Sequence, residues 1–222
     1  MTNSTYVPKP RELLPDWMVG LTDRVMNYYT KRYLNCEPVI LKNPPLPQEG
    51  HQYMLYAHVP FCHTLCTYCT FHRFLIKEWK AREYFQNLRK EMEYVKALGY
   101  DFTAMEVGGG TTTILEDELV KTLELANKLF PSIKEISCET DPQVIMTPQF
   151  RNLQGLVDRM SIGVQSFNDE ILKLSDRYEK FGSGEQIFER LQYAQELFPT
   201  CNVDMMFGFR GQSLDVLHED ME

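Results

Sequence analysis

Three cysteines stand close together in the first third of the chain. Cys62, Cys66 and Cys69 follow a C-x3-C-x2-C spacing directly after a predicted strand, so one loop can wrap a single metal centre. Thiolates favour iron–sulfur clusters or zinc, and structural zinc is normally closed by four ligands, whereas three cysteines leave one position vacant. A vacant iron can bind a substrate. The spacing therefore indicates an iron–sulfur cluster with one open position.

A zinc site is the structural alternative for the same loop. His63 or His72 could complete a Cys3His set, and the protein would then be a non-enzymatic zinc-binding module. The other cysteines are scattered, and we interpret them as small core residues or free thiols; they are Cys36, Cys138 and Cys201.

The elements that must position this loop follow a regular order. From residue 53 onward, short β-prone runs alternate with longer helical patterns, which is typical of βα units and a parallel sheet. The predicted strands are 53–58, 104–107, 135–138, 157–164 and 202–207. Apolar residues at three- and four-residue spacing predict two helices, one with Phe85, Leu88, Met92 and Val95 and one with Leu119, Leu123, Ala126 and Phe130.

The two ends of the chain differ from this pattern. Prolines flank a helix-prone stretch, 16–34, so we expect residues 1–50 to be an N-terminal extension with one helix and residues 51–222 to be the main domain. A last helix opens near Ser213 and meets no stop signal before Glu222. We therefore expect a fold that is truncated at its C-terminus.

Composition limits the partners. The chain has 222 residues, 43% of them apolar, which is enough to bury one good-sized core. Its 23 basic and 31 acidic residues give a net charge of −8, which disfavours binding to nucleic-acid phosphates. No apolar run approaches the roughly 20 residues of a membrane span, and there is no signal-peptide pattern. We expect a cytoplasmic protein without a nucleic-acid partner or a membrane span.

The cysteine segment resembles the signature of the radical S-adenosylmethionine superfamily. Residues 56–62, Tyr-x-His-x-Pro-Phe-Cys, are similar to the oxygen-independent coproporphyrinogen oxidase group within it. The likeness continues in order over residues 53–212. It is carried by a glycine-rich motif at 107–113, a glutamate motif at 136–142, a glutamine motif at 161–167 and an aspartate motif at 202–208.

This resemblance implies an α/β fold, an incomplete parallel (β/α) barrel whose strand C-terminal ends face a 4Fe-4S cluster held by the three cysteines. The vacant iron would bind the amino and carboxylate groups of S-adenosylmethionine, and one electron would release a 5'-deoxyadenosyl radical. The protein would orient the sulfonium and exclude water and oxygen. The resemblance places these residues around the cofactors: Tyr56, Tyr68, Gly109, Gly110, Thr111, Glu139, Gln165, Arg177 and Asp204.

Several of these residue types suit that task, and each also has an ordinary interpretation. The glycines at 108–110 let a ligand approach the backbone and offer amide donors to its carboxylate, although a tight turn explains them equally well. Glu139 would accept hydrogen bonds from ribose hydroxyls, or would be a solvated acid at a strand end. Arg177 would pair with a carboxylate, or would be a surface charge. No residue is assigned as the catalytic group.

The resemblance also implies a substrate. It favours oxygen-independent coproporphyrinogen III dehydrogenase, in which two propionates lose hydrogen and carbon dioxide and become vinyl groups. The partners would be a tetrapyrrole and an electron donor such as flavodoxin or ferredoxin. Phe71 stands where the oxidase typically has a further cysteine, as in haem-chaperone-like relatives, whereas the extension favours the oxidase or anaerobic haem-degrading methyltransferases. Thr112 replaces a usual proline, and residues 208–212 replace Gly-Leu-Pro-Gly-Gln with their glycines kept.

Overall fold

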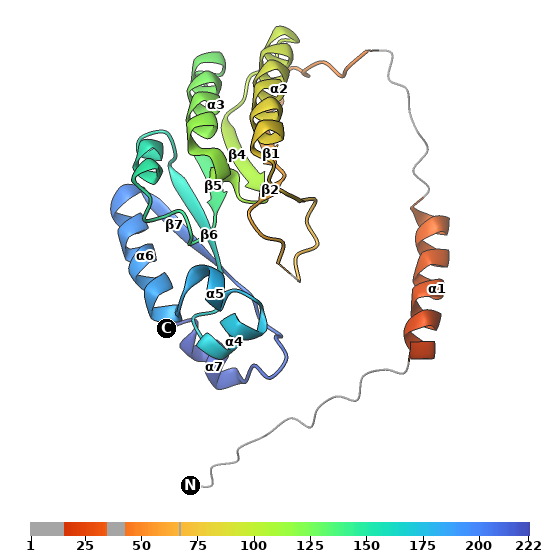
Figure 1. Cartoon of the computed structure of the whole chain (residues 1–222). Helices are drawn as coiled ribbons and strands as arrows, with labels where there is room; N and C mark the ends of the chain where they lie inside the picture. Colours follow the sequence, from red (N-terminus) through yellow and green to blue (C-terminus); the bar gives the residue numbers. More distant parts are fainter. Residues whose placement is uncertain (1–15, 35–42, 67) are drawn as a thin grey trace, which may run out of the picture. The chain divides into compact units, whose positions relative to one another are not determined.

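The N-terminal part of the chain forms a helix of its own. The computed structural model describes residues 16–34, 43–66 and 68–222, and it divides the chain into two units, Met1–Pro45 and Leu46–Glu222. In the first unit the predicted helix is confirmed as α1 (Asp16–Tyr33), drawn in red in Figure 1. Cys36 lies outside the described residues.

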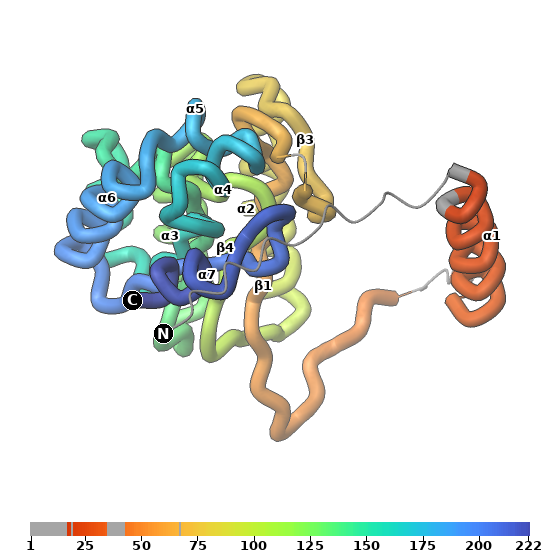
Figure 2. The backbone as a smooth tube through the Cα atoms, turned by 90° about the horizontal axis from the view of Figure 1, so that it is seen from below, coloured from red at the N-terminus to blue at the C-terminus, as the bar shows by residue number. Residues whose placement is uncertain are grey.

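The second unit is built on a five-stranded parallel sheet in the order β1-β4-β5-β6-β7. All the predicted strands are confirmed, as β1 (Met54–Val59), β4 (Ala104–Gly109), β5 (Ile136–Thr140), β6 (Arg159–Gln165) and β7 (Thr200–Met205). Each strand is added to the same edge, as happens when right-handed βα crossovers keep their helices on one face of the sheet. A sequential order builds a barrel wall, whereas a doubly wound sheet reverses its order. The unit is therefore an incomplete (β/α) barrel, whose path Figure 2 follows from β1 to α7.

Helices connect the strands and cover the sheet. The two helices predicted from apolar spacing are α2 (Glu78–Ala97) and α3 (Glu116–Leu129), and they pack against each other. Both appear above the sheet in Figure 1. The remaining helical segments are η1 (Thr112–Leu115), η2 (Pro148–Leu153), α4 (Asp169–Leu174), α5 (Tyr178–Phe181), α6 (Gly184–Leu197) and α7 (Leu214–Glu219).

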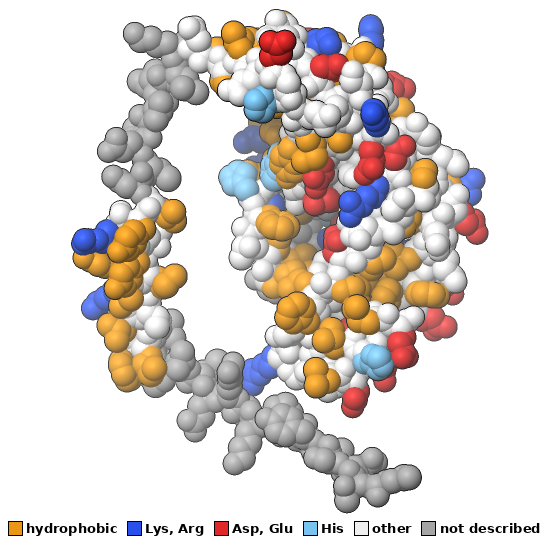
Figure 3. Space-filling model, turned by 180° about the vertical axis from the view of Figure 1, so that it is seen from behind, with side chains coloured by type: hydrophobic (Ala, Val, Ile, Leu, Met, Phe, Trp, Pro, Cys, Tyr) orange, Lys and Arg blue, Asp and Glu red, His pale blue; other side chains and the backbone are white. Residues whose placement is uncertain are grey.

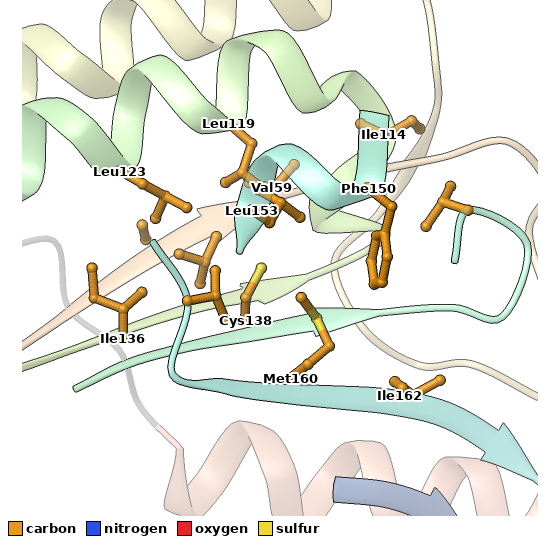
Figure 4. Packing of buried hydrophobic residues seen from close by; sticks show 14 of the residues in the cluster. Val59, Ile114, Leu119, Leu123, Ile136, Cys138, Phe150, Leu153, Met160 and Ile162 are labelled. Atoms are coloured by element: carbon orange, nitrogen blue, oxygen red, sulfur yellow. The ribbon is translucent and has the colours of Figure 1, made fainter. Parts of the chain in front are cut away.

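The core lies between this helical layer and one face of the sheet. Met160, Ile162 and Val164 alternate along β6 and are fully buried. Figure 4 shows how Leu119 and Leu123 of α3 meet side chains of β5 and β6 in this layer. Burial of one such side chain contributes about 1.5–3 kcal/mol, so the layer fixes the register of the strands.

The opposite face of the sheet is polar and only partly buried. Side chains alternate along a strand, so Ser161 and Gln165 of β6 point away from the core. Glu139 on β5 is paired with Ser161, and Asp204 on β7 is paired with Gly163, so both lie on the same face of the sheet as Ser161. Polar residues on three adjacent strands therefore share one face.

One local feature differs from the sequence-based prediction. Cys62 does not lie in a loop: it ends a two-residue strand, β2 (Phe61–Cys62), which pairs with β3 (Phe74–Leu75), and such short strands carry no periodicity to detect. The last helix begins after Ser213, which caps it, as the sequence predicts. The Asp220 side chain accepts hydrogen bonds from Ser166 Oγ and the Phe167 amide, both at 2.7 Å, and so ties this helix to the segment after β6.

The surface of the described chain mixes chemical types. On the face seen in Figure 3, acidic, basic and hydrophobic side chains are interspersed around a hollow. None of the helices in the described ranges combines the length and the apolar character needed to cross a membrane.

Candidate functional site

A pocket of about 460 Å³ opens at the C-terminal ends of the strands. It is lined by all three motif cysteines and by most of the residues expected around the cofactors, namely Tyr68, Gly109, Gly110, Thr111, Glu139, Gln165, Arg177 and Asp204. Tyr56 does not line it; the residue is 52% exposed, and its ring and the Glu139 carboxylate lie on the same side of Gly108. The pocket thus brings together residues from β2, the cysteine loop and four strands.

Strand geometry explains this convergence. In parallel sheets the carboxyl ends of all strands meet at one edge, where ligands collect. Gly163 of β6 pairs with Asp204 of β7, and the register then slips before Gln165. Gln165 has a φ of 78°, which is uncommon for a residue with a side chain. Bulges and strained backbone of this kind often occur beside functional sites, and here they turn the end of β6 at the pocket.

Glu139 is held in place by the glycine-rich segment. Its Oε2 accepts a hydrogen bond of 2.9 Å from the Gly109 amide. Burial raises the pKa of Glu139, the Gly109 amide opposes that rise, and the nearby carboxylates of Asp204 and Glu106 add to it. On the opposite side, Asp204 accepts hydrogen bonds from Ser161 and from Asn202.

For Gly109 and Gly110, the expected role of the amides as donors to a ligand is wrong. The amides at 109, 110 and 111 donate to Glu139, to the Val59 carbonyl and to the Phe61 carbonyl, so they are not free for a ligand carboxylate. The glycines are needed instead for close packing. A methyl group at Gly110 would lie 2.5 Å from the Phe61 oxygen and 2.9 Å from the Cys62 sulfur.

Two positions at which the sequence differs from the family pattern make defined contacts in the structure. Thr112 donates from its hydroxyl to the Glu139 carbonyl, which a proline could not do, and so fastens η1 to β5. In the segment 208–212, the Gln212 side chain accepts from two backbone amides, and Phe209 packs edge-on against the Tyr68 ring with centroids 6.2 Å apart.

The cysteines lie along the wall of the pocket. Cys62 is buried, and this burial raises the pKa of its thiol, although Thr111 and Lys180 act in the opposite direction. The Cys69 amide donates to the Cys66 carbonyl at 3.3 Å, which folds the loop back. Among the described side chains, no three His, Cys, Asp or Glu residues are grouped as ligands of one metal ion.

Arg177 gives the pocket a buried positive charge. Its side chain donates to the Tyr68 hydroxyl at 2.8 Å, to the Gly163 carbonyl and to the Cys66 sulfur at 3.9 Å, and none of these partners is a carboxylate. Its Nε is buried without a hydrogen-bond partner. A buried cation with a free donor is costly unless an anion completes the site. The residues therefore fit an anionic group such as a thiolate-bound cluster or a ligand carboxylate.

Tyr68 shares this environment. Burial raises its pKa to about 12, even though the Arg177 guanidinium acts to lower it. The phenol therefore stays protonated at neutral pH and holds Arg177 by accepting its hydrogen bond.

Neither histidine of the zinc alternative lines this pocket. His63 and His72 are both exposed. The His72 backbone carbonyl lies 3.1 Å from His58 Nε2. The His72 ring packs against the Phe74 ring, and both residues line a different groove. Of the scattered cysteines, Cys138 is a buried free thiol, as predicted, and Cys201 is a half-buried one.

Two charged residues of the pocket were missed by the sequence reasoning. Lys180 and Asp141 line it beside Cys62, and both side chains are only 12% exposed. Lys180 follows Arg177 by three residues, a spacing that puts side chains on one face of a helical turn, so a signal was present. Asp141 belongs to the glutamate motif at 136–142 but was given no role of its own; its buried carboxylate accepts a hydrogen bond from the Thr111 hydroxyl.

An incomplete parallel barrel with a cysteine-lined pocket at its strand ends defines a class of metallocofactor enzymes. The model of the radical SAM superfamily matches residues 56–222 of this chain. The chain belongs to the radical SAM superfamily, whose membership implies a 4Fe-4S cluster and S-adenosylmethionine.

Its relatives carry two different names. The heme chaperone HemW of Bacillus subtilis (strain 168) is 32% identical over 174 residues, which are 75% of this chain and 45% of that protein. The oxygen-independent coproporphyrinogen III oxidase of Escherichia coli (strain K12) is 34% identical over 168 residues, which are 72% of this chain and 36% of that protein. The solved structure of coproporphyrinogen III oxidase (HemN) from Escherichia coli matches with a TM-score of 0.66 and 28% identity, over 77% of this chain and 41% of that chain. The chain spans less than half the length of these relatives.

Proposed function

We propose that this chain is the cofactor-binding part of an oxygen-independent coproporphyrinogen III dehydrogenase, which turns propionate side chains into vinyl groups in haem biosynthesis. The observation that carries the proposal is the single pocket that contains the three motif cysteines and eight of the nine expected cofactor residues. The likeness to coproporphyrinogen III oxidases supports the substrate class.

The residues of the pocket divide the work. Cys62, Cys66 and Cys69 would hold the cluster through their thiolates. The guanidinium of Arg177, which has no carboxylate partner in the described chain, would pair with a carboxylate of the bound cofactor. Glu139 would accept hydrogen bonds from ribose hydroxyls, since it lines the pocket at the strand ends and a carboxylate has acceptor positions beyond the one that the Gly109 amide uses.

When bound, the cluster would supply the one electron that cleaves S-adenosylmethionine to methionine and a 5'-deoxyadenosyl radical, and this radical would take a hydrogen atom from a propionate. Loss of carbon dioxide, with one electron passing to an electron acceptor, would then leave the vinyl group. The chain's own contribution is to hold these groups and to keep water away. Met205 and Phe181 give the pocket apolar walls, while Gln165 and Asp204 offer polar groups at its rim. A tetrapyrrole would bind as substrate, and a flavodoxin or ferredoxin would donate electrons.

A haem-handling activity is the second candidate. Phe71 lines the pocket at the position where the oxidase group typically has a further cysteine, and it is 65% exposed. The likeness to heme chaperone HemW is as close as the likeness to the oxidase. The alternatives are therefore haem transfer or radical methylation of haem.

The deciding experiment uses the full-length protein, reconstituted without oxygen with iron and sulfide. It is incubated with S-adenosylmethionine, a reductant and coproporphyrinogen III, and the products are followed by mass spectrometry. Loss of two carboxyl groups together with 5'-deoxyadenosine supports the dehydrogenase. Formation of 5'-deoxyadenosine without decarboxylation would refute that substrate and favour the haem-handling candidate.

Metal analysis tests the non-enzymatic zinc alternative. Protein purified without oxygen should contain iron and labile sulfide and be brown. Stoichiometric zinc in its place would support the zinc module and contradict the radical chemistry.

A further inference from the structure

The cysteine loop is fastened by an arginine that none of the proposed cofactor contacts uses. Arg73 lies just before β3 and lines the pocket, and it is a further charged residue to which the sequence reasoning gave no role. Its Nη2 donates a hydrogen bond of 2.5 Å to the Cys66 carbonyl, and its Nη1 donates one of 3.4 Å to the Phe71 carbonyl. One planar guanidinium thus joins the two parts of the loop that flank Cys69.

The position of Arg73 is set by the strand that follows it. The amide of Phe74, the first residue of β3, donates to the Pro60 carbonyl at 2.7 Å and fixes this backbone beside β2. The Cys66 carbonyl that accepts from Arg73 also accepts from the Cys69 amide at 3.3 Å. One carbonyl oxygen therefore connects the arginine to the backbone of two motif cysteines.

The charge of Arg73 is not balanced by an acid. Among the described residues no carboxylate forms an ion pair with its guanidinium, whereas Lys180 in the same pocket faces Asp141 at 3.5 Å. The Nε of Arg73 is buried and has no hydrogen-bond partner. A cation withdrawn from water in this way is costly unless an anion lies nearby. Because its partners are neutral carbonyls, the guanidinium keeps its full positive charge beside Cys66.

We propose that Arg73 is a positioning residue of the cluster site, whose unpaired charge, held on the Cys66 carbonyl, raises the reduction potential of the bound 4Fe-4S cluster. This inference rests on the cluster of the proposed function. Only the backbone carbonyl and the short side chain of Cys66 separate the guanidinium from the sulfur. Reduction adds a negative charge to the cluster, and a fixed positive charge nearby stabilises that reduced state. Partial burial limits the screening of this charge by solvent.

The test is a redox titration, followed by electron paramagnetic resonance, of the full-length protein carrying its cluster. Arg73→Gln removes the charge but keeps an amide that can donate to a carbonyl. We expect the ratio of reduced to oxidised cluster, at a fixed ambient potential, to fall about tenfold, which is about 59 mV for a one-electron couple. Arg73→Lys keeps the charge and loses the planar guanidinium, and it should retain a potential close to that of the wild type.

Arg151→Gln is the matched control. Arg151 is an exposed arginine of η2 whose side chain contacts the Tyr193 hydroxyl, and it does not line the pocket. The same change of residue type there should leave the potential unchanged, because solvent screens an exposed charge. Equal shifts in Arg73→Gln and Arg151→Gln would report net charge alone and would overturn the inference.

The inference is also overturned if Arg73→Gln holds a full cluster at the wild-type potential. A shift in Arg73→Lys as large as that in Arg73→Gln overturns it too, because loop geometry rather than charge would then be the cause. Should Arg73→Gln assemble no cluster, an Arg73→Lys protein with a full cluster at the wild-type potential supports the inference, and any other result for Arg73→Lys overturns it. A wild-type protein that assembles no cluster refutes the proposed function itself, so the two failures are distinguishable.

Discussion

Gly110 is the position where one methyl group should have the largest effect on the site. In Gly110→Ala the new carbon would lie 2.5 Å from the Phe61 carbonyl oxygen, which must withdraw by almost 1 Å to reach the ordinary contact distance of 3.4 Å. It would also lie 2.9 Å from the Cys62 sulfur. The same carbonyl accepts a 2.7 Å hydrogen bond from the Thr111 amide, so withdrawal weakens that bond too.

The expected loss of stability is the sum of the overpacking at Gly110 and the weakened Thr111–Phe61 hydrogen bond. Overpacking in a tight interior costs about 1–3 kcal/mol, and one hydrogen bond contributes about 0.5–1.5 kcal/mol. We expect Gly110→Ala to lower the free energy of unfolding by about 2–4 kcal/mol in urea titrations. Because β2 moves with Cys62, the iron bound after reconstitution should fall below half of the wild-type amount.

A matched variant separates the two readouts. Gly155→Ala adds the same methyl group in open space, at a φ of 79°, away from the pocket. Its cost is backbone strain of roughly 1–2 kcal/mol, and it should bind iron fully. Equal iron loss in both variants, or full iron and full stability in Gly110→Ala, would refute the packing argument.

Three further changes test other contacts. Glu118→Gln should lower stability by about 2 kcal/mol at pH 7, because the buried carboxylate pairs with Arg89 at 2.7 Å and with Lys121 at 2.9 Å. Burial alone would raise the Glu118 pKa, but these partners lower it, so its stabilisation is present at neutral pH and is lost as the pH falls through that lowered value. The difference in the free energy of unfolding between wild type and Glu118→Gln, measured by urea titration, should therefore become smaller in acid. A difference that does not change with pH would contradict the pairing. Arg177→Lys keeps the charge but loses the planar guanidinium that binds Tyr68 and Gly163. The affinity for S-adenosylmethionine, measured by equilibrium dialysis, should therefore fall about tenfold or more, and an unchanged affinity would count against a contact between Arg177 and the ligand carboxylate. Cys66→Ser should abolish cluster assembly, since a hydroxyl is a poor soft-metal ligand, and retention of full iron would rule out Cys66 as a ligand.

The strands could be predicted because their signal is local. Alternating burial along residues such as Met160 and Ile162 is visible in the sequence as a β-prone apolar run, and the same is true of the helical spacing of Leu119 and Leu123. The pairing of Phe61–Cys62 with Phe74–Leu75 leaves no such trace, because two residues do not make a period.

The site could be predicted only in part. The cysteine spacing and the ordered motifs identify the residues that converge, since each motif lies at a strand end. The role of the Gly109 and Gly110 amides was wrong because hydrogen bonds to Glu139 and Val59, which only packing creates, use them internally. Lys180 and Asp141 were missed because each is an ordinary polar residue until burial brings the two together.

By itself the sequence determined the chemistry available to this protein: three thiols at cluster spacing, a βα alternation that makes a parallel sheet, and polar residues at its strand ends. Only the tertiary structure decided how charge is arranged around those thiols. The physical reason is that the effect of a charge depends on its surroundings: Arg177, without a carboxylate partner, and Lys180, beside Asp141, are alike as cations in the sequence. Burial and partners make the first an anion site and the second a fixed charge beside Cys62.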